Sequence, residues 1–145
     1  MISLLQRVSS SKVCIEGETV AEIDHGILAL IGIHQHDDEA TVISMVDKIL
    51  CYRIFEDNQG KMNLSLQDTR GSLLIVPQFT LVADTKKGKR PSFSTAADPA
   101  HGRKLFQSTI SYAQQSGVRL EHGVFGANMQ VHLTNDGPVT FILKS

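Results

Sequence analysis

Two proline-containing segments carry the most chemical information in this sequence. In the first, Gly137 precedes Pro138 in a turn between two runs of alternating apolar residues, 129–133 and 139–143. Asp136 followed by Gly predicts a hairpin turn. Pro138 cannot donate a hydrogen bond to a sheet ladder, and it permits a cis peptide bond. A Gly-Pro pair at this position can therefore present two carbonyl oxygens in a fixed direction.

The second segment is an apolar run, 71–83, that predicts a buried strand but is interrupted by Pro77 and Gln78. Proline is normally confined to strand edges or bulges, and a buried Gln needs hydrogen-bond partners. Thr80 would share a strand face with Gln78, and its hydroxyl becomes a nucleophile only where a base activates it. The alternative is an ordinary strand Thr bonded to a neighbour. Two interrupted strands suggest a site built from main-chain atoms.

A basic loop follows this run directly. Four of the five positions 86–90 are cationic, namely Lys86, Lys87, Lys89 and Arg90. Lys and Arg supply most of the affinity of proteins for nucleic-acid phosphates. A solvated loop without a partner is the alternative interpretation, but its place after the interrupted strand favours phosphate binding.

The sequence lacks the patterns that mark several other kinds of site. His34 and His36 alternate at a predicted strand end, but no Cys or carboxylate spacing around them matches a zinc site. The chain has no phosphate-binding Gly loop, no dinucleotide fingerprint and no nucleophile elbow. We therefore expect neither a metal nor a cofactor.

The elements that must position these residues form one predicted domain over 1–145. Helix starts are predicted at Asp37-Asp38, with helical spacing as far as Arg53, and at Asp98-Pro99, with an end near Ser116 before Gly117. The other predicted strands are 2–8 and 12–16, around Ser9-Ser10-Ser11, and 26–33. We predict a mixed α/β fold, with mixed, barrel-like sheets and two main helices.

Composition limits the partners and the compartment. The 145 residues are 41% hydrophobic and 20% charged, and the net charge of −1 gives no general attraction to nucleic acid or membrane. An anionic partner must therefore meet a local patch. Cys14 and Cys51 are too few for a disulfide framework, and we expect buried free thiols in a reducing compartment. No signal peptide or membrane span is evident, so a cytoplasmic location is expected.

Several separated motifs together resemble one known family. In these motifs and their order, the chain resembles the D-aminoacyl-tRNA deacylases of the bacterial and eukaryotic type. The segments that carry the resemblance are 6–8, 52–55, 60–64, 78–81, 87–93, 125–131 and 135–140. Pro77 departs from the family, which usually has Ser there, and resembles a related branch with altered specificity. Phe79 and the intact 137–140 motif favour the main branch.

The resemblance implies a substrate, an ester between an amino acid and the terminal adenosine of tRNA. Such an ester is already activated, so orientation and oxyanion stabilisation suffice. Main-chain N–H groups of Phe79 and Thr80 are the expected oxyanion donors, and Gln78 anchors their segment. Phe125 and Met129 line the adenine pocket or belong to the core.

The resemblance also implies a homodimer with an active site shared across the interface. A cis Gly137-Pro138 would enter the partner's site and receive the substrate ammonium on its carbonyls, and Arg7 would brace it. An L side chain would collide with this wall, whereas a D side chain would leave toward solvent. D-aminoacyl-tRNA and glycyl-tRNA would be cleaved. Two alternatives stay open: an editing deacylase for a mischarged L-aminoacyl-tRNA, and an inactive tRNA-binding module.

Overall fold

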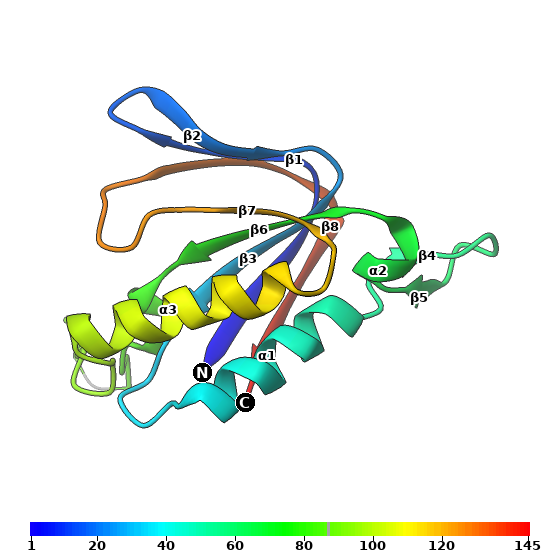
Figure 1. The fold of residues 1–145 in the computed structure, drawn as a ribbon. Helices are drawn as coiled ribbons and strands as arrows, with labels where there is room; N and C mark the ends of the chain where they lie inside the picture. Colours follow the sequence, from blue (N-terminus) through cyan, green and yellow to red (C-terminus); the bar gives the residue numbers. More distant parts are fainter. Residues whose placement is uncertain (87) are drawn as a thin grey trace.

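The computed structural model describes residues 1–86 and 88–145. Two long helices, α1 (Glu39–Cys51) and α3 (Pro99–Gln114), lie side by side over one face of the main sheet (Figure 1). The remaining helical elements are α2 (Leu66–Thr69) and the 3-10 helix η1 (Phe79–Val82). The strands are β1 (Ile2–Ile15), β2 (Glu18–Ile23), β3 (Gly26–Gly32), β4 (Phe55–Glu56), β5 (Met62–Leu64), β6 (Ser72–Pro77), β7 (Arg119–His122) and β8 (Gln130–Lys144).

The long strand β1 curls the sheet into a nearly closed barrel. Its first half pairs with β3 on one side and β8 on the other, and its second half pairs with β2 and β8. These pairs are antiparallel, whereas β3, β6 and β7 run parallel to one another, so the sheet is mixed. The predicted mixed α/β class, barrel-like sheet and two main helices are confirmed.

Alternation along the central strands separates two cores. On β6, Leu73 and Ile75 face the helices, while Leu74 and Val76 face the barrel interior. Both faces of this strand are buried, which explains why its sequence is continuously apolar. The strand β6 therefore has a core on each side, and it ends at Pro77.

Both predicted helix starts are confirmed. The Asp38 carboxylate accepts the Thr41 N–H at 2.8 Å, and the Asp98 carboxylate accepts the N–H of Ala100 and His101. The pKa of Asp38 is lowered chiefly by the Thr41 backbone N–H, because the ionised carboxylate is the better acceptor. The helices end at Cys51 and Gln114, two residues before the predicted ends.

Two strand predictions at the ends of the chain are wrong. The runs 2–8 and 12–16 form one strand, since Ser10 and Ser11 continue the pairing with β8. The predicted hairpin at 129–143 is also one strand: both runs pair with β1 instead of each other, and residues 136–139 bulge out of the register. Pairing to a distant strand satisfies the backbone groups that a hairpin would otherwise satisfy.

The interrupted run and one cysteine also differ from the prediction. The strand predicted over 71–83 stops at Pro77, and the chain turns into η1, so strand alternation does not govern residues 79–82. Cys14 is buried as expected, but Cys51 is exposed. Cys51 is the last residue of α1 and lies off the face formed by its buried residues, which end at Leu50.

Candidate active site

The turn from β6 into η1 presents main-chain donors. The Gln78 N–H donates to the Ile31 carbonyl at 2.7 Å, which fixes the point where the strand ends. The first N–H groups of a 3-10 helix have no acceptor within the helix. Across residues 1–86 and 88–145, no protein acceptor is recorded for the N–H of Phe79 or Thr80. Both can donate to a ligand oxygen.

Thr80 has no activating base in the structure. Its hydroxyl accepts a hydrogen bond from the Gln78 side-chain amide, and within the described chain no His or Lys bonds to it. An amide donor does not remove a proton, so the geometry does not support an activated Thr nucleophile. Instead, the contact links the two side chains at the beginning of η1.

A pocket of about 500 Å³ lies beside this turn. Its walls come from the end of β6, the beginning of α3 and the segment between β7 and β8. The lining residues are Val76, Pro77, Gln78, Phe79, Ala97, Pro99, Phe125, Gly126, Ala127, Asn128, Met129 and Val131. The structure thus brings four candidate site residues together, and none of the lining side chains is titratable. The largely apolar walls, with the Gln78 and Asn128 amides among them, suit a flat aromatic group such as a nucleobase.

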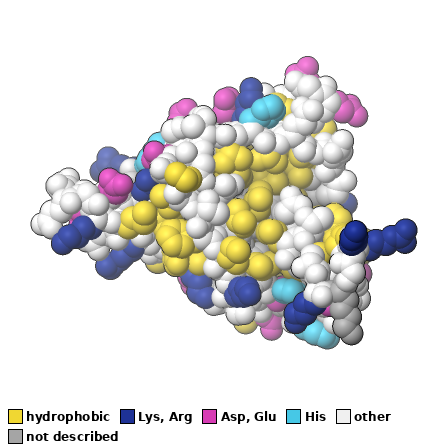
Figure 2. Space-filling model, turned by 180° about the vertical axis from the view of Figure 1, so that it is seen from behind, with side chains coloured by type: hydrophobic (Ala, Val, Ile, Leu, Met, Phe, Trp, Pro, Cys, Tyr) yellow, Lys and Arg dark blue, Asp and Glu magenta, His cyan; other side chains and the backbone are white. Residues whose placement is uncertain are grey.

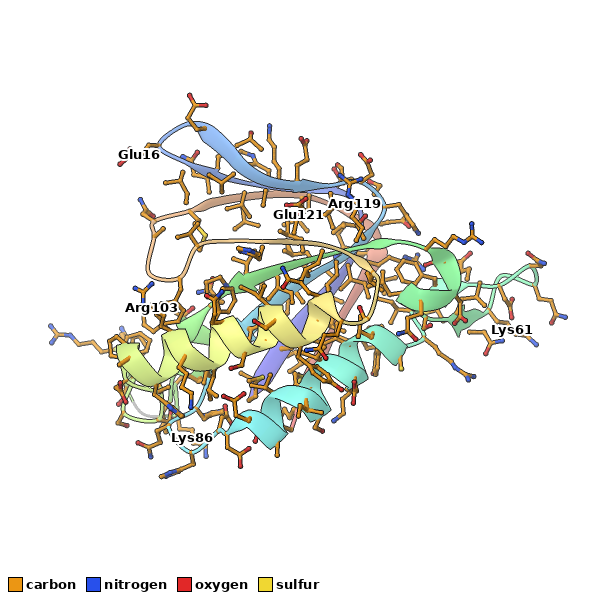
Figure 3. All side chains as sticks on the ribbon, viewed as in Figure 1. Glu16, Lys61, Lys86, Arg103, Arg119 and Glu121 are labelled. Atoms are coloured by element: carbon orange, nitrogen blue, oxygen red, sulfur yellow. The ribbon has the colours of Figure 1, made fainter. Side chains whose placement is uncertain are left out.

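Helix α3 supports the Phe125 wall of this pocket. The Arg103 guanidinium lies 5.1 Å from the centre of the Phe125 ring, and Figure 3 shows Arg103 reaching from α3 toward the β7–β8 segment. The Phe106 ring lies behind, 6.0 Å from the Phe125 ring. A Cβ at Gly102 would come within 3.1 Å of the same ring. These supports were not predicted from the sequence, because no local pattern links α3 to a segment about twenty residues further on.

Met129, near the end of the β7–β8 segment, packs against the residues at its beginning. Its sulfur accepts the Val124 N–H at 3.3 Å, and a Cβ at Gly123 would approach this sulfur to 2.9 Å. Met129 also packs against the barrel core. It therefore belongs to both the pocket wall and the core, the two roles considered from the sequence.

Gly137 and Pro138 lie on the exposed bulge of β8, and the peptide bond between them is cis. The buried side chain of Arg7 holds this bulge in place. Its Nε donates to the Asp136 carbonyl at 3.0 Å, and its Nη1 donates to the Ile54 carbonyl at 2.8 Å. Asn135 closes the bulge by accepting the Val139 N–H at 2.7 Å. Residues 136–139 have no partner in the register with β1.

The bulge and the pocket lie at opposite ends of β3. Val8 pairs with both Gly26 and Asn135, which places the bulge at the beginning of β3. Pro77 pairs with Ile31, which places the pocket at its end. Five residues of parallel strand span roughly 16 Å. One chain therefore holds two separate groups of candidate site residues.

The basic loop projects beside the pocket. The Asp84 N–H donates to the Ser92 carbonyl at 2.8 Å and the reverse bond is 3.0 Å, so the loop is closed at its base. Lys86, Lys89 and Arg90 are exposed, while Lys87 lies outside the described residues. The Phe93 ring, which follows the loop, contacts the Phe79 ring with centres 5.0 Å apart. Phe93 was not predicted as a site residue from the sequence, although its place beside the basic run was a signal.

Within the described chain, no three His, Cys, Asp or Glu side chains are gathered in a way that could hold a metal ion. Among the helices described, none is both long and apolar enough to span a membrane.

The chain is similar to known proteins over nearly its whole length. The family described as D-Tyr-tRNA(Tyr) deacylase matches residues 4–144. A D-aminoacyl-tRNA deacylase of Legionella pneumophila (strain Lens) is 55% identical over 144 residues, 99% of each chain. One of Thioalkalivibrio sulfidiphilus (strain HL-EbGR7) is 56% identical over 99% of this chain and 97% of its own.

Solved structures share the fold. One described as c-Myc DNA unwinding element binding protein has a TM-score of 0.95 at 36% identity, covering 100% of this chain and 99% of its own. One described as a probable eukaryotic D-amino acid tRNA deacylase has a TM-score of 0.85 over 98% and 97% of the two chains. Its 17% identity makes this second likeness one of fold alone.

These matches define the class of protein as a hydrolase that acts on aminoacyl-tRNA. The chain belongs to the D-aminoacyl-tRNA deacylase family.

Proposed function

We propose that this deacylase is a chiral proofreading enzyme of the cytoplasm, active as a homodimer. It hydrolyses D-aminoacyl-tRNA to the free D-amino acid and tRNA, and it rejects L-aminoacyl-tRNA. The observation that carries the proposal is the separation of the pocket from the Gly137-Pro138 bulge at opposite ends of β3. In a dimer, the bulge of a second copy can reach the pocket of the first.

The pocket holds the terminal adenosine, with Phe125 and Met129 against the base. The ester carbonyl then lies at the beginning of η1, where the N–H groups of Phe79 and Thr80 stabilise the oxyanion that forms when water attacks. Gln78 anchors this segment. No side chain of the pocket titrates, so the rate enhancement comes from orientation and main-chain electrostatics, and a ribose hydroxyl of the substrate assists the water.

Chirality is read by the second copy. The carbonyls of the partner's Gly137 and the partner's Pro138 accept the substrate ammonium in charge-assisted hydrogen bonds. Once the ammonium and the ester are held, the configuration at Cα decides where the side chain points. An L side chain meets the Gly-Pro wall and a D side chain points to solvent, while glycine meets nothing. Glycyl-tRNA is therefore cleaved as well.

An apolar row of the sheet that runs from the buried barrel core out to the surface suits the second copy. Val76, Leu30, Leu4 and Ile142 lie directly opposite one another across β6, β3, β1 and β8. Val76 is buried, Leu30 and Leu4 are half-buried, and Ile142 is 60% exposed. Figure 2 shows hydrophobic side chains gathered across the middle of the face that lies behind the sheet of Figure 1. Such a patch marks an interaction surface.

A mixed-subunit experiment tests the shared site. Ala127→Trp fills the pocket, and Gly137→Ala disturbs the bulge. Each homodimer should be inactive on D-aminoacyl-tRNA. Refolding the two together gives mixed dimers with one site that carries both changes and one that carries neither, so roughly a quarter of the original sites should recover. An active monomer, or no recovery in mixed dimers, would contradict the shared site.

A substrate panel tests the chemistry. We expect cleavage of D-alanyl-, D-tyrosyl- and glycyl-tRNA above spontaneous hydrolysis, with similar rates for the two D substrates, and resistance of L-alanyl-tRNA. Efficient cleavage of L-alanyl-tRNA would instead show the altered specificity that Pro77 suggests. Binding of tRNA without hydrolysis of any ester would show an inactive binding module.

A further inference from the structure

An aromatic pair connects the pocket to the basic loop. We infer that Phe93, supported by Phe79, is the stacking site for the nucleobase that precedes the terminal adenosine of the bound tRNA. This inference rests on the proposed function, because it requires the terminal adenosine to occupy the pocket.

Both rings are exposed in a position where a second base would arrive. Phe79 forms part of the pocket wall, yet 59% of it is exposed. Phe93 is 40% exposed, and its ring is tilted by 53° against that of Phe79. Because the two rings support each other, the accessible surface of Phe93 forms an apolar platform immediately outside the pocket.

The platform is held in place from both sides. The backbone pair of Asp84 with Ser92 fixes the residue before Phe93. On the other side, the Thr95 hydroxyl donates to the Val82 carbonyl at 2.5 Å, which ties the segment after Phe93 to η1. The Phe93 backbone is therefore anchored to the same short helix that presents the oxyanion donors, and little ordering is needed on binding.

The chemistry of the platform matches an unpaired 3′ end. Aromatic side chains bind single-stranded nucleotides by stacking, and a cationic groove nearby holds the backbone. Lys86, Lys89 and Arg90 are exposed in the loop that leads into Phe93. A strand with its last base in the pocket would place the next base on Phe93 and the following phosphates at these cations.

The experiment compares substrates that do and do not contain the second base. The substrates are D-tyrosyl-adenosine, the D-tyrosyl ester of the dinucleotide cytidylyl-adenosine, the same dinucleotide without the cytosine base, and full D-tyrosyl-tRNA. The variants are Phe93→Leu, which removes the ring but keeps the bulk, and Phe93→Tyr, which keeps the ring. Met62→Ala is the control, since Met62 is 49% exposed on β5, away from the pocket lining.

We expect Phe93→Leu to lower kcat/KM about 5- to 100-fold on the dinucleotide ester and on tRNA, as stacking on one aromatic ring implies. D-tyrosyl-adenosine should be cleaved as by the wild type, and Phe93→Tyr and Met62→Ala should be unaffected on every substrate. An equal loss on D-tyrosyl-adenosine would show that Phe93 merely packs the loop onto η1 and would overturn the inference, as would no loss on any substrate.

Two measurements do not depend on the Leu variant. With the wild-type enzyme, removing the cytosine base from the dinucleotide should lower kcat/KM by a similar factor. In a non-hydrolysable tRNA analogue, fluorescent pyrrolo-cytidine next to the terminal adenosine should be quenched on binding. If removing the base leaves kcat/KM unchanged, or if no quenching is seen, the stacking site is refuted but the proposed function is not. A wild-type enzyme that hydrolyses no D-tyrosyl ester refutes the proposed function.

Discussion

Arg7 and Asp136 are joined by two contacts of one guanidinium. Arg7 Nε donates to the Asp136 carbonyl at 3.0 Å and lies 3.3 Å from the Asp136 carboxylate, while Nη1 donates to the Ile54 carbonyl at 2.8 Å. The planar guanidinium therefore fixes the Gly137-Pro138 bulge to the segment before β4. Lysine cannot replace it, because an ammonium presents no such fork.

Arg7→Lys should consequently weaken both stability and activity. Loss of the bond to the buried Ile54 carbonyl should cost roughly 1–3 kcal/mol of unfolding free energy. The looser bulge should lower kcat/KM on D-aminoacyl-tRNA by at least about tenfold. Urea unfolding and deacylation kinetics measure the two effects. Stability loss with full activity would show that the bulge takes no part in the reaction.

Gly137→Ala should abolish most activity, because the position does not accept a side chain. Its φ is +143°, and a Cβ would come within 2.8 Å of the Val139 backbone nitrogen. We expect kcat/KM to fall on the order of a hundredfold. Gly17→Ala is the matched control: its φ is also positive, at +87°, but nothing lies within 4 Å of a Cβ there. The control should lose about 1 kcal/mol of stability and no activity. Equal activity of the two variants would contradict a role for the bulge.

Thr80→Ala should retain a measurable share of the rate. The hydroxyl accepts a bond from Gln78 but has no base beside it in the described chain. Losing this bond loosens the start of η1, and the rate should fall about 3- to 30-fold. Loss of an activated nucleophile would instead cost several orders of magnitude. Rapid-quench kinetics with labelled substrate measure the rate, and an aminoacyl-enzyme trapped at Thr80 would disprove main-chain catalysis.

Replacing Lys86, Lys89 and Arg90 together by Ala should weaken tRNA binding. Removing three phosphate contacts should also reduce the slope of log affinity against log salt by about two to three units. Activity on an aminoacyl-adenosine fragment should change little. Lys61→Ala is the control, because Figure 3 shows Lys61 and Lys86 at distant parts of the molecule. Equal losses on tRNA and the fragment would mean that the loop supports the fold.

The free energy of unfolding should fall in acid as the Asp38 and Asp98 carboxylates that cap the two long helices become protonated. The pKa of Asp38 is lowered chiefly by the Thr41 N–H, and that of Asp98 chiefly by the His101 N–H. A carboxylate whose pKa is lowered in the folded state stabilises the fold at pH values above its ordinary pKa of 3.8. This stabilisation is lost as the pH falls below 3.8 and through the lowered pKa.

Asp38→Asn isolates one cap. Asn still accepts the Thr41 N–H but does not titrate, so its unfolding free energy should decline less than that of the wild type between about pH 6 and about pH 3. Urea unfolding at each pH measures the difference. Parallel declines of the two proteins would place the acid sensitivity elsewhere.

The sequence by itself determined the features whose signals are local. Asp38 and Asp98-Pro99 mark helix starts because a cap bonds to N–H groups two or three residues away. The apolar run of β3 and the separated motifs were likewise readable without a structure, and the motifs identified the family correctly.

Only the tertiary structure decided which strands pair and which distant side chains come into contact. Whether 129–133 pairs with 139–143 or with β1 depends on a strand more than a hundred residues away, so the bulge at Gly137-Pro138 looked like a hairpin tip. The pocket walls, the Phe79–Phe93 pair and the Arg103–Phe125 contact likewise join segments that are distant along the chain. The separation of pocket and bulge was also not readable from the sequence, because it depends on the register of β3 with its neighbours. That register is set by the packing of the whole sheet.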